Sequence, residues 1–299
     1  MSIIVFFKRK IAHRVTQLTL LTIFITISSC CKNNDCTCEK ENPIPYWEHF
    51  IAHAGGAIEG NLYTNCLEAL DLSYSKGCKL FELDLNLTTD GKIVAQHDAP
   101  GKTEAEFLAQ KILGKYTPLN MVAINNWFKN HPDAILVTDK INDPQIIFDE
   151  FLFRDRVIME LFTWEAVDKA IELGIEPMAS ENLIFGSSKK AIELGIMPTI
   201  PKRATEIEQV FKEKKVVYIC TSRYYSIKGH EDFFRQLKNN GIKNYVCHLE
   251  LPVPIGGQTA EEYVWNYEMN FCYGMYANDL SLLESLLNGT NPTLSSHSK

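Results

Sequence analysis

Glu82 and Asp84, two acidic residues separated by one position, lie between two histidines, His53 and His97. Alternate residues of a β-strand face the same side, so both acids project together if this segment is a strand. Two carboxylates directed into an apolar interior repel each other and are costly to desolvate, and a divalent cation would relieve both effects. The alternative is a solvent-facing strand with two exposed acids, but the apolar residues of 80–85 favour a strand that is buried on both faces.

The two histidines could transfer protons beside such a metal. Imidazole is the side chain that gains and loses a proton near neutral pH. His53 and His97 follow apolar segments, and enzymes with a β/α barrel place catalytic groups at the C-terminal ends of strands. A single histidine there would more often be structural. Two that bracket an acidic pair predict a general acid and a general base, with the two roles open between them.

The segments that position these residues alternate between short apolar runs and amphipathic helical patterns. We expect strands at 50–53, 80–85, 134–138, 157–161, 175–179, 216–221, 244–249 and 273–277. We expect helices at 65–76, 120–130, 164–173, 187–194, 205–213 and 230–240, several of which end at a glycine. This alternation predicts parallel β/α architecture, and about eight strands suit a (β/α)₈ TIM-type barrel over residues 46–290.

Two alternatives to this arrangement stay open. Residues 197–200 could form a ninth strand or replace the one at 175–179. A doubly wound open sheet would also contain alternating strands and helices, but no Gly-x-Gly-x-x-Gly motif follows the first strand.

The motifs match those of a known family in order and spacing. The matching residues are His53-x-Gly55, Asn65, Glu82-x-Asp84, Thr88-x-Asp90-Gly91 and His97-Asp98, with a weaker match at Gly274–Asp279. Together they resemble the glycerophosphodiester phosphodiesterase family, which is related to the phosphatidylinositol-specific phospholipases C. The resemblance covers most of residues 50–285, and only its first third is specific.

The resemblance implies roles for individual residues. His53 and His97 correspond to the catalytic acid and base, and Glu82 and Asp84 to metal ligands. Asp139 is the best match to a third carboxylate ligand of the family, at the end of the third strand. Lys140 follows it directly, so a regular strand would point the two in opposite directions, and a bulge would be needed for both to reach the site.

Departures from the family concern the phosphate. Ala54 stands where the family has an arginine that helps to hold the phosphate, and Thr64 stands where it has a glutamate. A tryptophan-containing motif on the seventh strand is absent, and Cys247-His248 occurs there instead. A phosphodiester still requires a cation. Lys140 and Arg223 are therefore candidate phosphate contacts.

Three further residues compete for roles in this site. Lys202 and Arg203 are rivals for the phosphate contact, although a solvated surface charge is the more common role for Arg223 and for each of these two residues. Glu160, on the fourth expected strand, is a possible extra metal ligand or a structural acid.

The expected activity is metal-dependent phosphodiester cleavage. A ligand set made only of oxygen atoms favours Mg²⁺ or Ca²⁺. The substrate would be a small phosphodiester similar to a glycerophosphodiester, or a glycan or lipid head group at a surface, cleaved to a phosphomonoester and an alcohol. Two alternatives remain: a lyase with the same barrel that releases a cyclic phosphate, and a non-catalytic binding lipoprotein.

The N-terminal residues predict export. Residues 1–29 combine four basic residues with a short apolar run, as in a signal peptide, and Ile27-Ser28-Ser29-Cys30 resembles the lipobox of bacterial lipoproteins. We expect Cys30 to be lipidated, residues 30–45 to form a polar tether and residues 291–299 a disordered tail. The protein would then be a membrane-anchored lipoprotein on the periplasmic or cell-surface side.

Charge limits the partners. The chain carries a net charge of −7, and loss of residues 1–29, with four positive charges and no negative ones, would bring it to −11. Such an acidic protein is unsuited to neutralising nucleic-acid phosphates or to binding anionic lipids through a basic surface. We therefore expect no nucleic-acid partner and membrane attachment through the N-terminal lipid alone.

Replacing Cys30 tests this expectation. Cys30→Ser should move the protein from the membrane fraction to the soluble fraction and abolish labelling with a fatty-acid analogue. Cys31→Ser is the matched control and should leave both unchanged. Labelling that survives Cys30→Ser would contradict the assignment.

Overall fold

A computed structural model describes residues 44–186, 202–226, 229–249 and 258–290. The chain divides into two units, Met1–Pro43 and Ile44–Lys299, and all described residues belong to the second. The expected signal peptide with Cys30, most of the tether, the helix at 187–194, the segment 197–200 and the tail lie outside the described residues. Within the described ranges, no helix is both long enough and apolar enough to cross a membrane.

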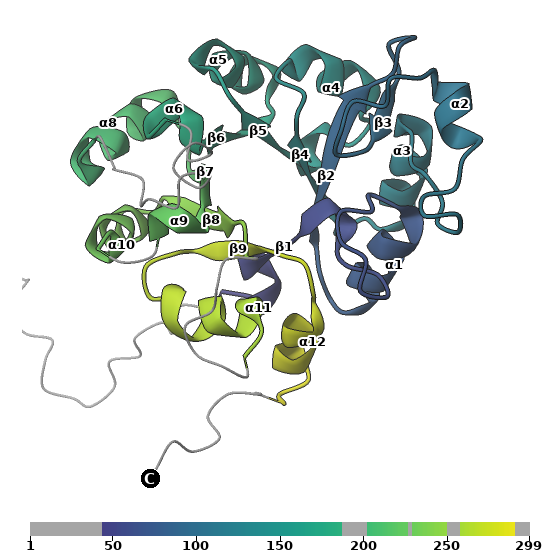
Figure 1. Cartoon of the computed structure of the whole chain (residues 1–299). Coiled ribbons are helices and arrows are strands. Elements are labelled where there is room, and N and C mark those ends of the chain that lie inside the picture. Colours follow the sequence, from purple (N-terminus) through teal and green to yellow (C-terminus); the bar gives the residue numbers. More distant parts are fainter. Residues whose placement is uncertain (1–43, 187–201, 227–228, 250–257, 291–299) are drawn as a thin grey trace, which may run out of the picture. The chain divides into compact units, whose positions relative to one another are not determined.

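Eight parallel strands form a closed ring with helices around it (Figure 1). They are β1 (Phe50–Ala52), β2 (Leu80–Leu87), β4 (Ile135–Asp139), β5 (Val157–Leu161), β6 (Glu176–Ser180), β7 (Tyr218–Ser222), β8 (Lys243–Cys247) and β9 (Gly274–Ala277). The ring closes because β1 pairs with both β2 and β9. The barrel is thus confirmed, and the open sheet is wrong. β6 pairs with β5 and β7, so the expected strand at 175–179 keeps its place in the ring.

Helices connect the strands around the outside of the ring. They are α1 (Leu67–Ser75), α2 (Glu104–Leu108), α3 (Met121–Asn130), α4 (Pro144–Glu150), α5 (Trp164–Leu173), α6 (Glu181–Ile184), α8 (Ala204–Lys214), α9 (Arg223–Ser226), α10 (Glu231–Asn239), α11 (Ala260–Tyr263) and α12 (Ser281–Leu287). Short 3₁₀ turns lie at η1 (Tyr46–His49), η2 (His53–Gly55) and η3 (Arg154–Arg156), and η4 (Val264–Glu268) is a π-helix. The helices expected at 65–76, 120–130, 164–173, 205–213 and 230–240 are confirmed.

A ninth strand, which the sequence did not predict, lies outside the ring. β3 (Ile93–Ala95) runs antiparallel to the end of β2, with Ala95 opposite Leu85. The chain then returns toward the barrel, where the Gln96 N–H donates to the Asp84 carbonyl at 2.8 Å. This hairpin brings the residue after Gln96, His97, back toward Asp84.

The alternation of side chains along β2 separates the core from the site. Phe81 and Leu83 face outward into the main core beneath the helices. Leu80 faces inward, in a smaller apolar cluster that fills the barrel interior. Glu82 and Asp84 continue this inward-facing row toward the C-terminal end of the strand, because they share its parity. The inner face of β2 is therefore apolar at its N-terminal end and acidic toward its C-terminal end, where the barrel opens at what we call its mouth.

Candidate metal and catalytic site

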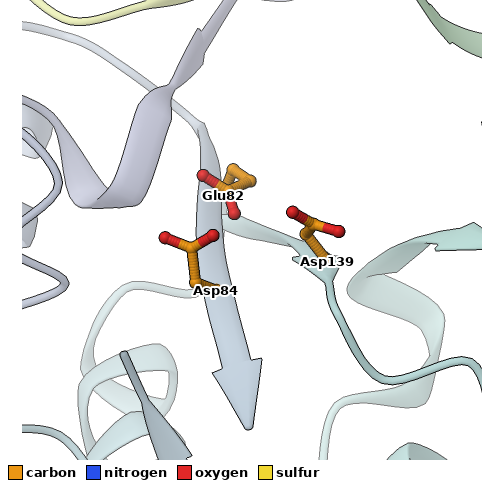
Figure 2. Close-up of side chains that lie close together, drawn as sticks. All are labelled: Glu82, Asp84 and Asp139. Carbon is orange, nitrogen blue, oxygen red and sulfur yellow. The ribbon is translucent and has the colours of Figure 1, made fainter. Parts of the chain in front are cut away.

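Three carboxylates from two adjacent strands converge at the barrel mouth. Asp84 on β2 lies opposite Asp139 on β4 in the parallel register, and Glu82 lies two positions earlier. One carboxylate oxygen from each residue lies within 4.8 Å of the others. Figure 2 shows the three side chains facing a common space between the strands. The structure thus brings together the three residues that the sequence assigned as metal ligands.

Backbone and amide groups hold the first two carboxylates in place. The Ala54 N–H donates to Glu82 Oε2 at 2.6 Å. The Asn65 amide donates to Asp84 Oδ2 at 2.8 Å, and its own Oδ1 accepts from the Asp84 N–H at 3.0 Å. Such contacts orient ligating oxygen atoms before the ion arrives. Glu82 Oε1, in contrast, is buried and has no hydrogen-bond partner among the described residues. A bound cation would satisfy this oxygen atom.

Electrostatics favour a cation at this point. Burial, and next the charges of Asp84 and Asp139, raise the pKa of Glu82 well above its ordinary value. A divalent ion among the carboxylates would reverse this shift, because it favours the ionised form of each ligand. The donors are all carboxylate oxygens, which suit a hard cation. The residues present therefore fit a divalent metal.

Asp139 and Lys140 both reach the site. β4 ends at Asp139, and Lys140 adopts a left-handed conformation with φ of 71°, so the alternation of a regular strand stops there. Lys140 Nζ forms ion pairs with Asp139 and, at 3.0 Å, with Asp84. Desolvation alone would lower the pKa of Lys140, but the two carboxylates outweigh it and raise the pKa. The left-handed conformation of Lys140 at the end of β4, rather than a bulge, therefore lets both side chains reach the site.

Glu160 is a buried residue of β5, the strand that pairs with β4. Burial, followed by the charge of Asp139, raises the pKa of Glu160. Its carboxylate hydrogen bonds with Ser180 and Cys220. Its role as a metal ligand stays a prediction, since the three converging oxygens belong to Glu82, Asp84 and Asp139.

His53 lies directly after β1, in the turn η2. Its Nδ1 is 3.2 Å from Asn278 Oδ1, at the end of β9. The ring packs edge-on against Tyr63 and Tyr276, with centroid distances of 4.8 and 5.7 Å. Gly56 ends the turn with φ of 96°, where an added Cβ would lie 2.1 Å from Ser73 Oγ. This glycine is required both by its conformation and by its close approach to α1.

His97 lies on the loop that follows β3 and is exposed. Its Nδ1 is 3.1 Å from Asp98 Oδ1. The Asn86 amide, near the end of β2, donates to the carbonyls of Gln96 at 2.7 Å and His97 at 3.2 Å. The hairpin therefore fixes the backbone of His97 to the strand that carries the acidic pair.

The other expected phosphate contacts lie in different settings. Arg223 is fully buried, and its Nε donates to Glu268 Oε1 at 2.8 Å. Lys202 is exposed, and Arg203 pairs with Glu206 at the start of α8. Contact of Arg223 with phosphate stays a prediction, and Lys140 is the candidate cation that the structure places at the carboxylates.

The sequence assigned no role to two residues beside His53, Asn278 and Tyr63, although Asn278 lies in the matching segment Gly274–Asp279. Asn278 follows the last barrel strand, and its position at a C-terminal strand end could have marked it. Tyr63 carries no motif and lies in a loop, so composition and spacing gave no signal for it.

The fold has many counterparts among solved structures. A glycerophosphodiester phosphodiesterase from Parabacteroides distasonis is similar with a TM-score of 0.57 and 15% identity, over 81% of this chain and 97% of that chain. One from Thermotoga maritima gives a TM-score of 0.53 and 18% identity, over 79% and 97%. A phosphodiesterase from Oleispira antarctica, in complex with the product sn-glycerol-3-phosphate, gives 0.56 and 14%, over 80% and 96%. At these identities the comparison establishes the fold, which is that of the family whose motifs the sequence resembles.

Comparison of the sequence alone finds neither a protein-family model nor a curated protein that matches the chain.

Removing a carboxylate should weaken metal binding. Glu82→Gln and Asp84→Asn should each lower the affinity for Mg²⁺ or Ca²⁺ by at least about 10-fold in calorimetry, because each removes a charged ligand. Glu176→Gln is the matched control, since Glu176 begins β6 at the opposite end of the barrel. Unchanged affinity in both site variants would show that the ion does not bind here.

The raised pKa of Glu82 predicts how stability depends on pH. Without metal, the folded protein holds a proton that the unfolded chain releases, so this contribution to stability falls as the pH rises above 4.5, the ordinary value. In a chelator, the melting temperature of Glu82→Gln should therefore depend less steeply on pH than that of the wild type. Added divalent ion should stabilise the wild type more at about pH 8 than at about pH 5. Parallel pH curves for the two proteins would contradict the assigned shift.

Proposed function

We propose that the protein is a metal-dependent phosphodiesterase that hydrolyses a small phosphodiester, similar to a glycerophosphodiester, to a phosphomonoester and an alcohol. The observation that carries the proposal is the carboxylate cluster at the barrel mouth, which lies beside elements that also supply two histidines. The fold shared with glycerophosphodiester phosphodiesterases supports it, as does the neighbour solved with sn-glycerol-3-phosphate.

Glu82, Asp84 and Asp139 would hold the cation. When bound, Mg²⁺ or Ca²⁺ supplies positive charge that polarises the phosphoryl group. Asn65 and the Ala54 backbone keep the carboxylates oriented. We assign Lys140 as the contact for the negatively charged phosphate of the substrate, because its ammonium group lies at the carboxylates that would hold the metal. This assignment provides a cation in place of the arginine that Ala54 replaces.

The histidines move the protons. An amide oxygen only accepts hydrogen bonds, so Asn278 Oδ1 keeps a proton on Nδ1 of His53 and makes Nε2 the exchanging nitrogen. The Asp98 carboxylate acts in the same way on His97. One imidazole takes the proton of the attacking water, and the other gives a proton to the oxygen of the departing alcohol. The products are a phosphomonoester and a free alcohol.

We also propose that the enzyme acts outside the cytoplasm, attached by a lipid at Cys30. The apolar run and the Ile27–Cys30 motif support this placement. An extracytoplasmic site would give access to phosphodiesters of lipid head groups and surface glycans.

Replacing the histidines tests the mechanism. His53→Ala and His97→Ala should each lower kcat on an active phosphodiester by about 10²–10⁴-fold, the usual effect of losing a general acid or base. Metal affinity should be unchanged, since neither residue belongs to the carboxylate cluster. His230→Ala, beside the outer helix α10, is the matched control.

Product analysis decides between the reactions. Phosphorus NMR should show a phosphomonoester from the first turnover, whereas a persistent cyclic phosphate would identify a lyase. A protein that binds metal and phosphodiesters without cleaving any of a broad panel would be the binding lipoprotein. Full activity in both histidine variants would refute the proposed mechanism.

A further inference from the structure

Tyr63 lies between the two histidines. Its ring centroid is 4.8 Å from that of His53, with the rings nearly perpendicular, and 6.2 Å from that of His97. Tyr63 is 37% exposed, so its ring is not a core side chain. A single aromatic side chain thus contacts both imidazoles, although His53 and His97 come from different elements of the fold.

The backbone of Tyr63 adopts a conformation that residues with a side chain rarely adopt. Its φ is 57°, a left-handed conformation that is unusual for an aromatic residue. Residues of this loop with positive φ are Ala54, Gly55, Gly56, Glu59, Gly60, Tyr63 and Asn65. Such strain persists only where surrounding contacts impose it, and it occurs often at functional sites.

The contacts that impose the strain belong to the metal site. Asn65, two residues after Tyr63, binds Asp84 through both atoms of its amide. Its N–H also donates to the Ala54 carbonyl at 3.1 Å, and the Ala54 N–H binds Glu82. The loop is therefore tied at both ends to the residues that hold the carboxylates, and the position of Tyr63 follows from these ties.

We propose that Tyr63 is a positioning residue that sets the orientation of both imidazoles relative to the carboxylate cluster. The proposal rests on the proposed function for its effect on rate. Edge-to-face contact between aromatic rings has a preferred geometry, because the positive edge of one ring meets the negative face of the other. For His53, Tyr63 adds to the restraint from Asn278 and Tyr276. For His97, which is exposed, it supplies an aromatic neighbour on the side of His53.

Two variants separate the ring from the backbone that carries it. Tyr63→Phe keeps the ring and removes the hydroxyl group. Tyr63→Asn removes the ring but suits a positive φ, because asparagine adopts the left-handed conformation more readily than other residues with a side chain. Both should fold with melting temperatures close to that of the wild type.

The first readout does not require turnover. In the metal-bound protein, NMR signals of the His53 and His97 ring protons should carry ring-current shifts from Tyr63. These shifts should persist in Tyr63→Phe and disappear in Tyr63→Asn. Unchanged imidazole signals in Tyr63→Asn would overturn the proposal, whatever the activity of the enzyme.

The second readout is kinetic. Tyr63→Asn should lower kcat by about 10–100-fold, since small misplacements of catalytic groups are costly, while KM changes by less than about 3-fold. Tyr63→Phe should restore kcat to within about 3-fold of the wild type. A loss in KM alone, or an equal loss of kcat in Tyr63→Phe, would overturn the positioning role. If the wild type cleaves no phosphodiester, the proposed function fails, and the ring-current shifts alone decide the placement of the imidazoles.

Discussion

Repulsion among buried carboxylates is the constraint on which the mouth of the barrel depends. Glu82, Asp84 and Asp139 lie with oxygen atoms within 4.8 Å of one another, two of the residues being almost fully buried. Such a group is stable only with partners, and the neighbouring structure supplies them. The Ala54 N–H donates a hydrogen bond to one oxygen of Glu82, and the Asn65 amide donates one to an oxygen of Asp84. Lys140 provides a positive charge. The positive φ angles of Lys140 and of the loop residues are backbone conformations of higher energy that this arrangement requires.

The acidic pair was predictable because β2 is a regular strand. A period of two puts Glu82 and Asp84 on one face and Phe81 and Leu83 on the other, and the structure has this division. The barrel was predictable from a different pattern, the alternation of eight short apolar runs with helical segments. The helix α4 was not predicted, although Asp143 caps it and Pro144 begins it, because its seven residues are too few to show a helical period.

Other parts of the site depend on distant contacts and could not be derived from local pattern. Whether Asp139 and Lys140 share a side is decided by one backbone angle at a strand end. The environment of Arg223 depends on Glu268, 45 residues later, in a π-helix. Removing one partner of such a buried pair costs about 3–5 kcal/mol, so this arginine already has a structural role. Asn278 reaches His53 only because the closing of the barrel brings β9 beside β1. Tyr63 reaches it through a loop that Asn65 ties to Asp84.

The hairpin of β2 and β3 divides the site into parts of unequal stability. The three carboxylates lie on strands of the closed ring, whereas His97 lies on a loop outside it, which is held by the Asn86 amide and by a backbone hydrogen bond from Gln96. Exposed segments with few such contacts open at a lower free energy than a central sheet. In the proposed mechanism, local opening of this loop would therefore displace His97 while the strands that carry the carboxylates stay folded. The proposed proton transfer and the integrity of the fold therefore depend on different parts of the molecule, and warming or mild denaturant should affect the first before the second.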